Sequence, residues 1–184
     1  MGFNPYRDFI SGLILSSLIP EDKWSTLPQI KKANVVGPYH FNGIIEGFTI
    51  VADSALRTYT GRRDMIVTDL DGPMEIILGD KNAIKVVHAH GDNIQRIGDL
   101  VPRLKGTVLG TTQSIPHGTV RNIGGFTDGD RSIIMAKLMG AVEVEVFGFN
   151  FEDPVDEPVD RKLLKLEIAK EIIEELKNIR LTYH

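Results

Sequence analysis

The chain has 184 residues, of which 42% are hydrophobic and 25% are charged, and its formal net charge is -4. This length and composition are typical of one globular domain with a full hydrophobic core, and the negative charge argues against nucleic acid as a partner. The sequence contains no cysteine, which excludes disulfides and cysteine-ligated metals and fits a cytoplasmic protein.

The first 30 residues are predicted to form a helical segment of a single domain that spans residues 1–184. The apolar run at 10–19 is too short to cross a membrane. It lacks the basic leader of a targeting segment, because Arg7 is followed at once by Asp8. We therefore expect no membrane partner. The helix should pack on the body of the protein or on a second copy in a homo-oligomer.

Short apolar, often β-branched runs recur along the chain, and each ends in glycine or polar residues. Such runs are typical of strands that are buried on both faces. Segments with helical spacing lie between them at 93–104 and 132–139. The predicted fold is therefore α/β: a three-layer, Rossmann-like, mostly parallel sheet with helices on both faces. Ligands of such sheets bind beyond the carboxyl ends of the strands. The strands are predicted at 34–36, 48–52, 65–67, 84–87, 107–109 and 142–147.

Two aspartates, Asp69 and Asp71, come directly after one of these apolar runs. Residues two apart in a strand project to the same side, so the two carboxylates can converge beyond the strand end. Mg²⁺ prefers one or two carboxylates together with water and phosphate oxygens. The alternative interpretation is a turn, in which Asp71 and Gly72 simply end the strand.

The segment 88–93, with the sequence H-A-H-G-D-N, follows the next strand. His88 and His90 share one face of that strand and could bind a transition metal, although hydrogen bonding to phosphate is favoured. Asp92 has two interpretations. It can begin a capping box for the helix that follows, or it can join the two preceding aspartates as a metal ligand.

The segment 124–131, with the sequence G-G-F-T-D-G-D-R, is the second dense group of polar residues and glycines. Gly125 permits close approach of a backbone, and Thr127 with Asp130 resembles a capping box. Capping leaves Asp128 and Arg131 unexplained. A helix N-terminus favours anions, and Arg131 could add a charged fork for phosphate.

The chain is predicted to end in an amphipathic helix over residues 159–184. Leu164, Ile168, Ile172, Leu176 and Ile179 form one apolar stripe at helical spacing. The acidic, proline-rich segment at 152–158 is predicted to be a solvated loop and a candidate lid.

Four motifs occur in the order V-A-D-S-A at 51–55, T-D-L-D-G at 68–72, H-A-H-G-D-N at 88–93 and G-G-F-T-D-G-D-R at 124–131. With them the chain resembles the archaeal-type 6-hydroxymethyl-7,8-dihydropterin pyrophosphokinases and, more distantly, thiamine pyrophosphokinases. The resemblance covers about residues 33–150. It implies Mg²⁺-dependent transfer of a diphosphoryl group from ATP to a pterin alcohol, in folate or methanopterin synthesis. The sequence departs from the family at Gly37, where the first glycine turn is shorter.

The resemblance also implies roles for individual residues. Asp69, Asp71 and Asp92 would hold Mg²⁺, Asp128 or Asp130 would accept the hydroxyl proton, and Arg131 would neutralise phosphate charge. The other residues expected to bind ATP or the pterin are Gly37, Asp53, Ser54, His88, His90, Asn93, Thr112, Gln113, Gly125 and Thr127.

Two other functions fit part of the sequence. A nucleotide-sugar glycosyltransferase would use a D-x-D pair to hold a metal on a diphosphate, but it would leave the motifs at 88–93 and 124–131 unexplained. A non-catalytic nucleotide-binding module would have the same site without turnover.

Overall fold

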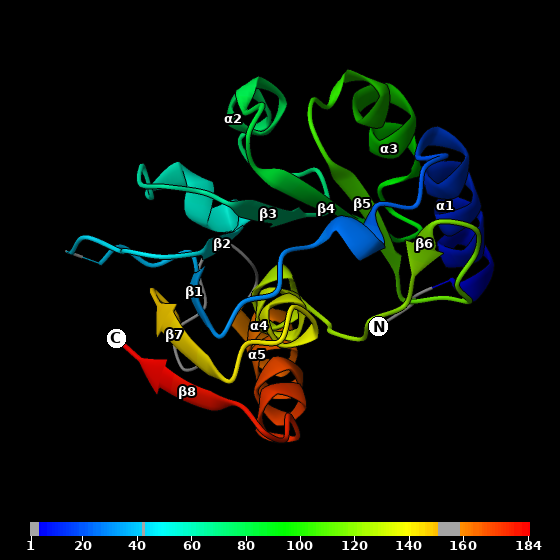
Figure 1. Ribbon diagram of the computed structural model, residues 1–184. Coiled ribbons are helices and arrows are strands. Elements are labelled where there is room, and N and C mark those ends of the chain that lie inside the picture. Colours follow the sequence, from blue (N-terminus) through cyan, green and yellow to red (C-terminus); the bar gives the residue numbers. More distant parts are fainter. Residues whose placement is uncertain (1–3, 42, 151–158) are drawn as a thin grey trace.

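The computed structural model describes residues 4–41, 43–150 and 159–184, and its centre is an eight-stranded sheet between helices (Figure 1). The strand order is β6-β5-β4-β3-β2-β1-β7-β8, and each pair of neighbouring strands is parallel. The predicted α/β fold is thereby confirmed. The strands are β1 (Lys32–Val36), β2 (Thr49–Ala52), β3 (Met65–Thr68), β4 (Ile84–Ala89), β5 (Val108–Thr112), β6 (Val120–Arg121), β7 (Glu143–Phe147) and β8 (Arg180–Tyr183).

Helices cover both faces of this sheet, with α1, α2 and α3 on one side and α4 and α5 on the other (Figure 1). Alternate strand residues face the two layers. Val35 and Val67 pack with Ile133 of α4, whereas Val87 packs with Leu15 of α1 on the opposite face. The helices are α1 (Pro5–Leu18), α2 (Met74–Gly79), α3 (Ile94–Leu100), α4 (Asp128–Leu138) and α5 (Val159–Glu174).

The N-terminal helix α1 packs against β5 and α3. Asn4 caps it by accepting hydrogen bonds from the backbone N–H groups of Tyr6 and Arg7. Leu15 and Ile19 are buried in the same cluster as Val87, so the apolar side of the helix packs on the body of the protein. Within the described ranges, no helix has both the length and the apolar character that crossing a membrane requires.

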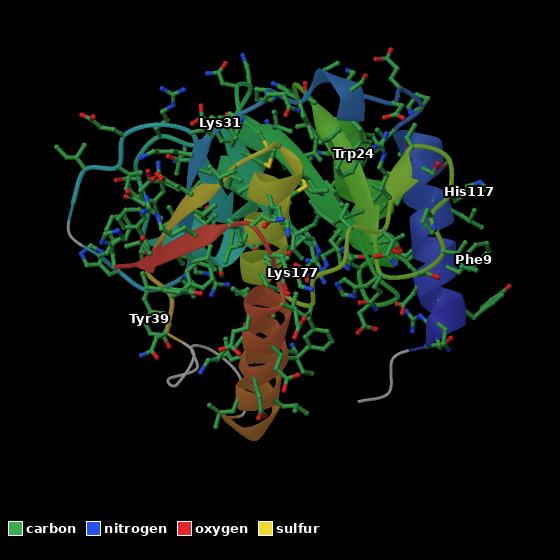
Figure 2. All side chains as sticks on the ribbon, turned by 60° about the horizontal axis from the view of Figure 1, so that its bottom comes forward. Phe9, Trp24, Lys31, Tyr39, His117 and Lys177 are labelled. Atoms are coloured by element: carbon green, nitrogen blue, oxygen red, sulfur yellow. The ribbon has the colours of Figure 1, made fainter. Side chains whose placement is uncertain are left out.

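The order of the strands locates the expected binding edge. The chain runs outward from β1 to β6 and then returns to place β7 beside β1. Ligands of open α/β sheets bind beyond the carboxyl ends of the strands, near such a reversal. Lys31, which precedes β1, lies at one end of the sheet, and Tyr39, which follows β1, lies at the other (Figure 2). The end marked by Tyr39 is therefore where a site is expected.

The end of the chain differs from the prediction. The helix expected over residues 159–184 ends at Glu174, and β8 then extends the sheet beside β7. Leu181 alone in this four-residue strand has a partly buried side chain, so the strand has no clear period of two. Ile179 also falls at the helical spacing of the preceding apolar residues, so the sequence pattern predicted a longer helix in place of this strand. The short elements α2 and β6 were also not predicted, and the candidate lid at 152–158 lies outside the described residues.

Candidate active site

Three carboxylates meet beyond the ends of β2 and β3. Asp53, Asp69 and Asp71 each offer an oxygen, and these oxygens all lie within 4.8 Å of one another. The strand register explains this, because Ala52 pairs with Val67 and the next residues of both strands therefore emerge together. The third carboxylate of the cluster is therefore that of Asp53, whereas the sequence predicted Asp92 as the third metal ligand. The side chain of Asp92 is exposed and lies outside this cluster.

A turn at Leu70, rather than the strand itself, aims the two aspartates at one point. β3 ends at Thr68, and Leu70 has a φ of 67°, in the left-handed region that bulky residues avoid. The Leu70 side chain is buried, which holds the turn in place. Thr68 fastens the turn to its neighbour: its Oγ1 accepts from the Leu70 N–H (2.8 Å) and donates to Asp53 Oδ2 (2.7 Å). The predicted convergence is present, but its cause is this turn.

Mutual repulsion and burial make the cluster electrostatically unfavourable without a cation. Burial, a hydrogen bond that Asp71 donates to Asp69, and the charge of Asp69 together raise the pKa of Asp71 to about 7. Burial and the charge of Asp69 also raise the pKa of Asp53. Although burial opposes it, hydrogen bonds from His90 and Asp71 hold the pKa of Asp69 well below its ordinary value. Asp69 is therefore the carboxylate that stays ionised, and its neighbours hold protons more tightly.

The surroundings of Asp69 fit a hard divalent cation. Its Oδ1 is buried and has no hydrogen-bond partner in the part of the chain that the structure describes. Its Oδ2 lies 3.2 Å from His90 Nε2. The Asp92 N–H donates to His90 Nδ1 (3.3 Å), so Nε2 carries the proton and donates to the carboxylate. Outer residues that orient a ligand in this way are common around metal sites, and carboxylate oxygens are ligands that Mg²⁺ takes.

Asn93 holds this part of the site together from behind. Its side chain is completely buried, and Nδ2 donates to the backbone oxygens of Asp69 (2.9 Å) and His88 (2.7 Å). Its Oδ1 accepts from the His90 N–H and from Ser11 of α1. Asn93 therefore fixes the backbone of Asp69, and it does not line the cavity described below. The capping box considered for Asp92 is not formed, because α3 begins at Ile94, its N-cap residue is Asn93, and no side chain caps it.

Helix α1 supports the same loop, which the sequence analysis did not foresee. Asp8 is buried and accepts from the Gly91 N–H (2.6 Å) and from Gln113 Nε2 (2.9 Å). A signal existed, because Asp8, Ser11 and Leu15 share one face of α1, and polar side chains on a buried face need partners.

The N-terminus of α4 forms the predicted capping box. The Asp130 carboxylate accepts from the backbone N–H and hydroxyl of Thr127 (both 2.6 Å) and from the Phe126 N–H (2.7 Å). Both carboxylate oxygens are thus occupied and the residue is buried, so the geometry favours Asp128 over Asp130 as the base. Asp128 accepts from Arg131 Nη1 (3.0 Å), and burial followed by the charge of Asp53 raises the pKa of Asp128 well above its ordinary value.

A cavity of about 300 Å³ joins these groups at the carboxyl ends of the strands. Phe126, Phe149 and Lys165 also line it, although the sequence analysis did not propose them. The predicted site residues that line the cavity are Asp53, Ser54, Asp69, Asp71, His88, His90, Asp92, Gln113, Thr127, Asp128 and Arg131.

Three further predicted residues do not line the cavity and serve the packing around it. A Cβ on Gly37 would lie 2.6 Å from the backbone oxygen of Gly148, so Gly37 allows two strand ends to pass closely rather than cradling phosphate. Thr112 is buried, accepts from the Ser114 N–H and contacts α1. Gly125 has a φ of 87° and packs directly on Arg131.

The raised pKa values give a testable dependence of stability on pH. An unfolded aspartate releases its proton near pH 4, whereas folded Asp71 does so near pH 7. The folded state therefore binds more protons in this window, and stability falls as the pH rises through it. We expect the melting temperature in EDTA to fall between pH 4 and pH 7. Mg²⁺ should raise it more at pH 8 than at pH 5, and an equal rise at both values would contradict the assigned cluster.

The sequence of this chain is similar to those of three curated proteins that share one name. A protein named 6-hydroxymethyl-7,8-dihydropterin pyrophosphokinase from Methanothermobacter thermautotrophicus is 40% identical over 152 residues, covering 73% of this chain and 65% of the relative. A protein of the same name from Pyrococcus furiosus is 42% identical over 148 residues, covering 72% of this chain and 63% of the relative. Another, from Methanocaldococcus jannaschii, is 33% identical over 218 residues, covering 96% of this chain and 90% of the relative. The chain thus spans slightly less than two thirds of the first two relatives and most of the third.

The comparisons with protein-family models and with solved structures give no information about function. No protein-family model matches the chain. Alanine racemase of Clostridium difficile 630 aligns with 99% of this chain and 50% of its own, at 12% identity and a TM-score of 0.24. A likeness at that score carries no argument about fold or function.

Proposed function

The chain belongs to the 6-hydroxymethyl-7,8-dihydropterin pyrophosphokinase family, and from this we propose that it transfers the diphosphoryl group of ATP to 6-hydroxymethyl-7,8-dihydropterin. The hydroxymethyl oxygen attacks the β-phosphorus of ATP, the bond from that phosphorus to the oxygen bridging the α-phosphorus breaks, and AMP leaves. The observation that carries the proposal is the cluster of Asp53, Asp69 and Asp71 in a cavity beyond the strand ends, within a chain related to enzymes of that name.

The acidic cluster supplies the place for a cation. ATP is an anion, and the aspartates that line the cavity would repel it unless a divalent cation lay between them. Asp53, Asp69 and Asp71 would hold Mg²⁺, with the unpartnered Oδ1 of Asp69 as one ligand. When bound, the ion would neutralise phosphate charge during the transfer. His90 keeps Asp69 oriented, and Asn93 fixes its backbone.

Asp128 is the proposed general base. A base works best when its pKa lies near the working pH, and burial with neighbouring negative charge raises the pKa of Asp128. A cation on the cluster would lower that pKa again by offsetting the charges of the other aspartates. Arg131 holds the Asp128 side chain from its helical position three residues on. The hydroxyl proton of the acceptor would pass to Asp128 as the oxygen attacks.

The nucleotide product tests this function directly. The protein is incubated with ATP, Mg²⁺ and 6-hydroxymethyl-7,8-dihydropterin, and the nucleotides are separated by ion exchange. We expect AMP to appear one for one with pterin diphosphate, and both to disappear when EDTA replaces Mg²⁺.

Two controls distinguish the other possibilities. Omitting the pterin should leave ATP intact, and AMP or ADP formed without it would indicate simple hydrolysis. ADP in place of AMP would exclude diphosphoryl transfer and leave a conventional kinase. ATP that binds but is never consumed, with or without the pterin, would indicate the non-catalytic nucleotide-binding module.

A further inference from the structure

The cavity has two chemically different parts. Asp53, Asp69, Asp71 and Asp128 supply negative charge where β2 and β3 meet the N-terminus of α4. Beyond β4 and β5 the lining consists of His88, His90 and Gln113, together with the exposed carboxylate of Asp92. His88 pairs in register with Thr111, and Gln113 projects from the same face two residues further along β5 and its continuation. Arg131 reaches this part from α4, since its charge acts on the His88 imidazole.

Two buried nitrogen atoms of this lining remain without a partner. His88 is only 3% exposed, and its Nδ1 lies 3.0 Å from Thr111 Oγ1, but its Nε2 has no hydrogen-bond partner among the residues described. Arg131 is 2% exposed, and within the same described ranges its Nε is also unpartnered, although its two terminal nitrogens bond to Asp128 and Gly125. Buried polar atoms in proteins are nearly always paired. Both residues line the cavity, so a ligand there can satisfy them.

The third group of this lining, the side-chain amide of Gln113, has a fixed orientation. The Gln113 amide donates its Nε2 to Asp8 Oδ2, and a carboxylate there requires the donor end of the amide. The Oε1 of Gln113 is therefore turned away from Asp8 and can accept a hydrogen bond from a ligand. A side-chain hydrogen bond with Gln113 acts to raise the pKa of His88, against the larger effect of burial, which places the amide and the imidazole in the same part of the cavity.

The hydrogen-bonding groups of His88, Arg131 and Gln113 together favour an uncharged ligand that carries both donors and acceptors. Burial and the charge of Arg131 hold the pKa of His88 well below its ordinary value, which favours the neutral imidazole, with one donor and one acceptor nitrogen. Arg131 Nε can only donate, and Gln113 Oε1 can only accept. An amide-like edge of a heterocycle, with a carbonyl oxygen beside an N–H group, matches this alternation, whereas a triphosphate does not.

We propose that His88, Gln113 and the Nε of Arg131 form the subsite that binds the heterocycle of the acceptor alcohol, leaving the acidic part for the nucleotide phosphates. This inference rests on the proposed function. His88 is the residue that carries it, because its imidazole is fixed on one side by Thr111 and open to the cavity on the other. The acceptor's ring would lie toward β4 and β5, and its hydroxymethyl group toward Asp128.

Steady-state kinetics of His88 variants separate this subsite from a structural role. His88→Leu removes the nitrogen, and His88→Gln keeps a polar group at a similar reach. We expect His88→Leu to raise the KM for the pterin about tenfold, the effect of one lost hydrogen bond to a buried group, with the KM for ATP within about twofold. His88→Gln should recover part of the loss. Quenching of pterin fluorescence by the protein without ATP gives the same comparison for binding alone.

Gln113→Leu is the independent variant, and it should also raise the KM for the pterin selectively. The inference is overturned if the variants raise the KM for ATP instead, or if all three leave pterin binding unchanged. It is also overturned if His88→Gln folds but binds pterin no better than His88→Leu. These results differ from a failure of the proposed function itself, in which the unmodified protein would neither bind nor convert the pterin.

Discussion

Replacing Asp69 by Asn should abolish activity while leaving the protein folded. The substitution removes the charge of the one carboxylate in the cluster whose pKa is held low, and it weakens a ligand whose Oδ1 is buried and unpartnered among the described residues. Loss of an outer partner of a metal ligand typically costs 10–100-fold in affinity or activity. We therefore expect kcat/KM to fall by at least about 100-fold, with a matching loss of Mg²⁺ affinity measured by titration calorimetry.

Two neighbouring variants calibrate this result. His90→Ala removes the partner of Asp69 Oδ2 and should give an intermediate loss, of about 10-fold to 100-fold. Asp92→Asn changes an exposed carboxylate in the same cavity and should have the smallest effect of the three. If Asp92→Asn were as damaging as Asp69→Asn, Asp92 would belong to the metal site and the cluster described here would be incomplete. Near-normal activity of Asp69→Asn would refute the cluster as a whole.

The site was predictable where a short local pattern fixes the geometry. A β-branched run that ends in polar residues shows both the strand and its carboxyl end, so Asp69, Asp71 and His88 could be assigned to one edge of the sheet. The capping box at Thr127 and Asp130 was also readable, because it depends on residues three apart. Local signals therefore identified much of the cavity's lining.

The sequence could not show which residues meet across the fold. Asp53 joins Asp69 only because β2 and β3 pair in a particular register, so no local pattern indicated that Asp53, and not Asp92, completes the cluster of three carboxylates. The role of Asp92 as a metal ligand stays a prediction. Asp130 and Asn93 had the right chemistry, but their side chains are used inside the protein. Whether a polar group faces a ligand or a neighbouring backbone depends on packing, which a single sequence does not reveal. The supporting role of Asp8, 83 residues from its partner Gly91, was missed in the same way.

Asp128→Asn should produce a protein that is inactive but no less stable than the original. The asparagine keeps an oxygen that can accept from Arg131 Nη1, so the local hydrogen bond survives. It removes a group whose folded pKa is raised by burial and by the charges of Asp53 and Asp69. A raised carboxyl pKa destabilises the fold above the pH at which the unfolded aspartate ionises, near 4. The variant should therefore match the original at pH 4 and exceed its stability at pH 8, both in EDTA.

Thr127→Ala, one residue earlier, is the matched control. It deletes the helix cap and should cost about 1 kcal/mol of stability at either pH, while leaving the acidic cluster in place. Chemical unfolding at pH 4 and pH 8, together with turnover of the pterin, separates the two residues. A stability loss in Asp128→Asn similar to that of Thr127→Ala would mean that Asp128 is a structural partner of Arg131. A gain of stability together with a loss of turnover is expected of a catalytic carboxylate whose surroundings disfavour its charged form.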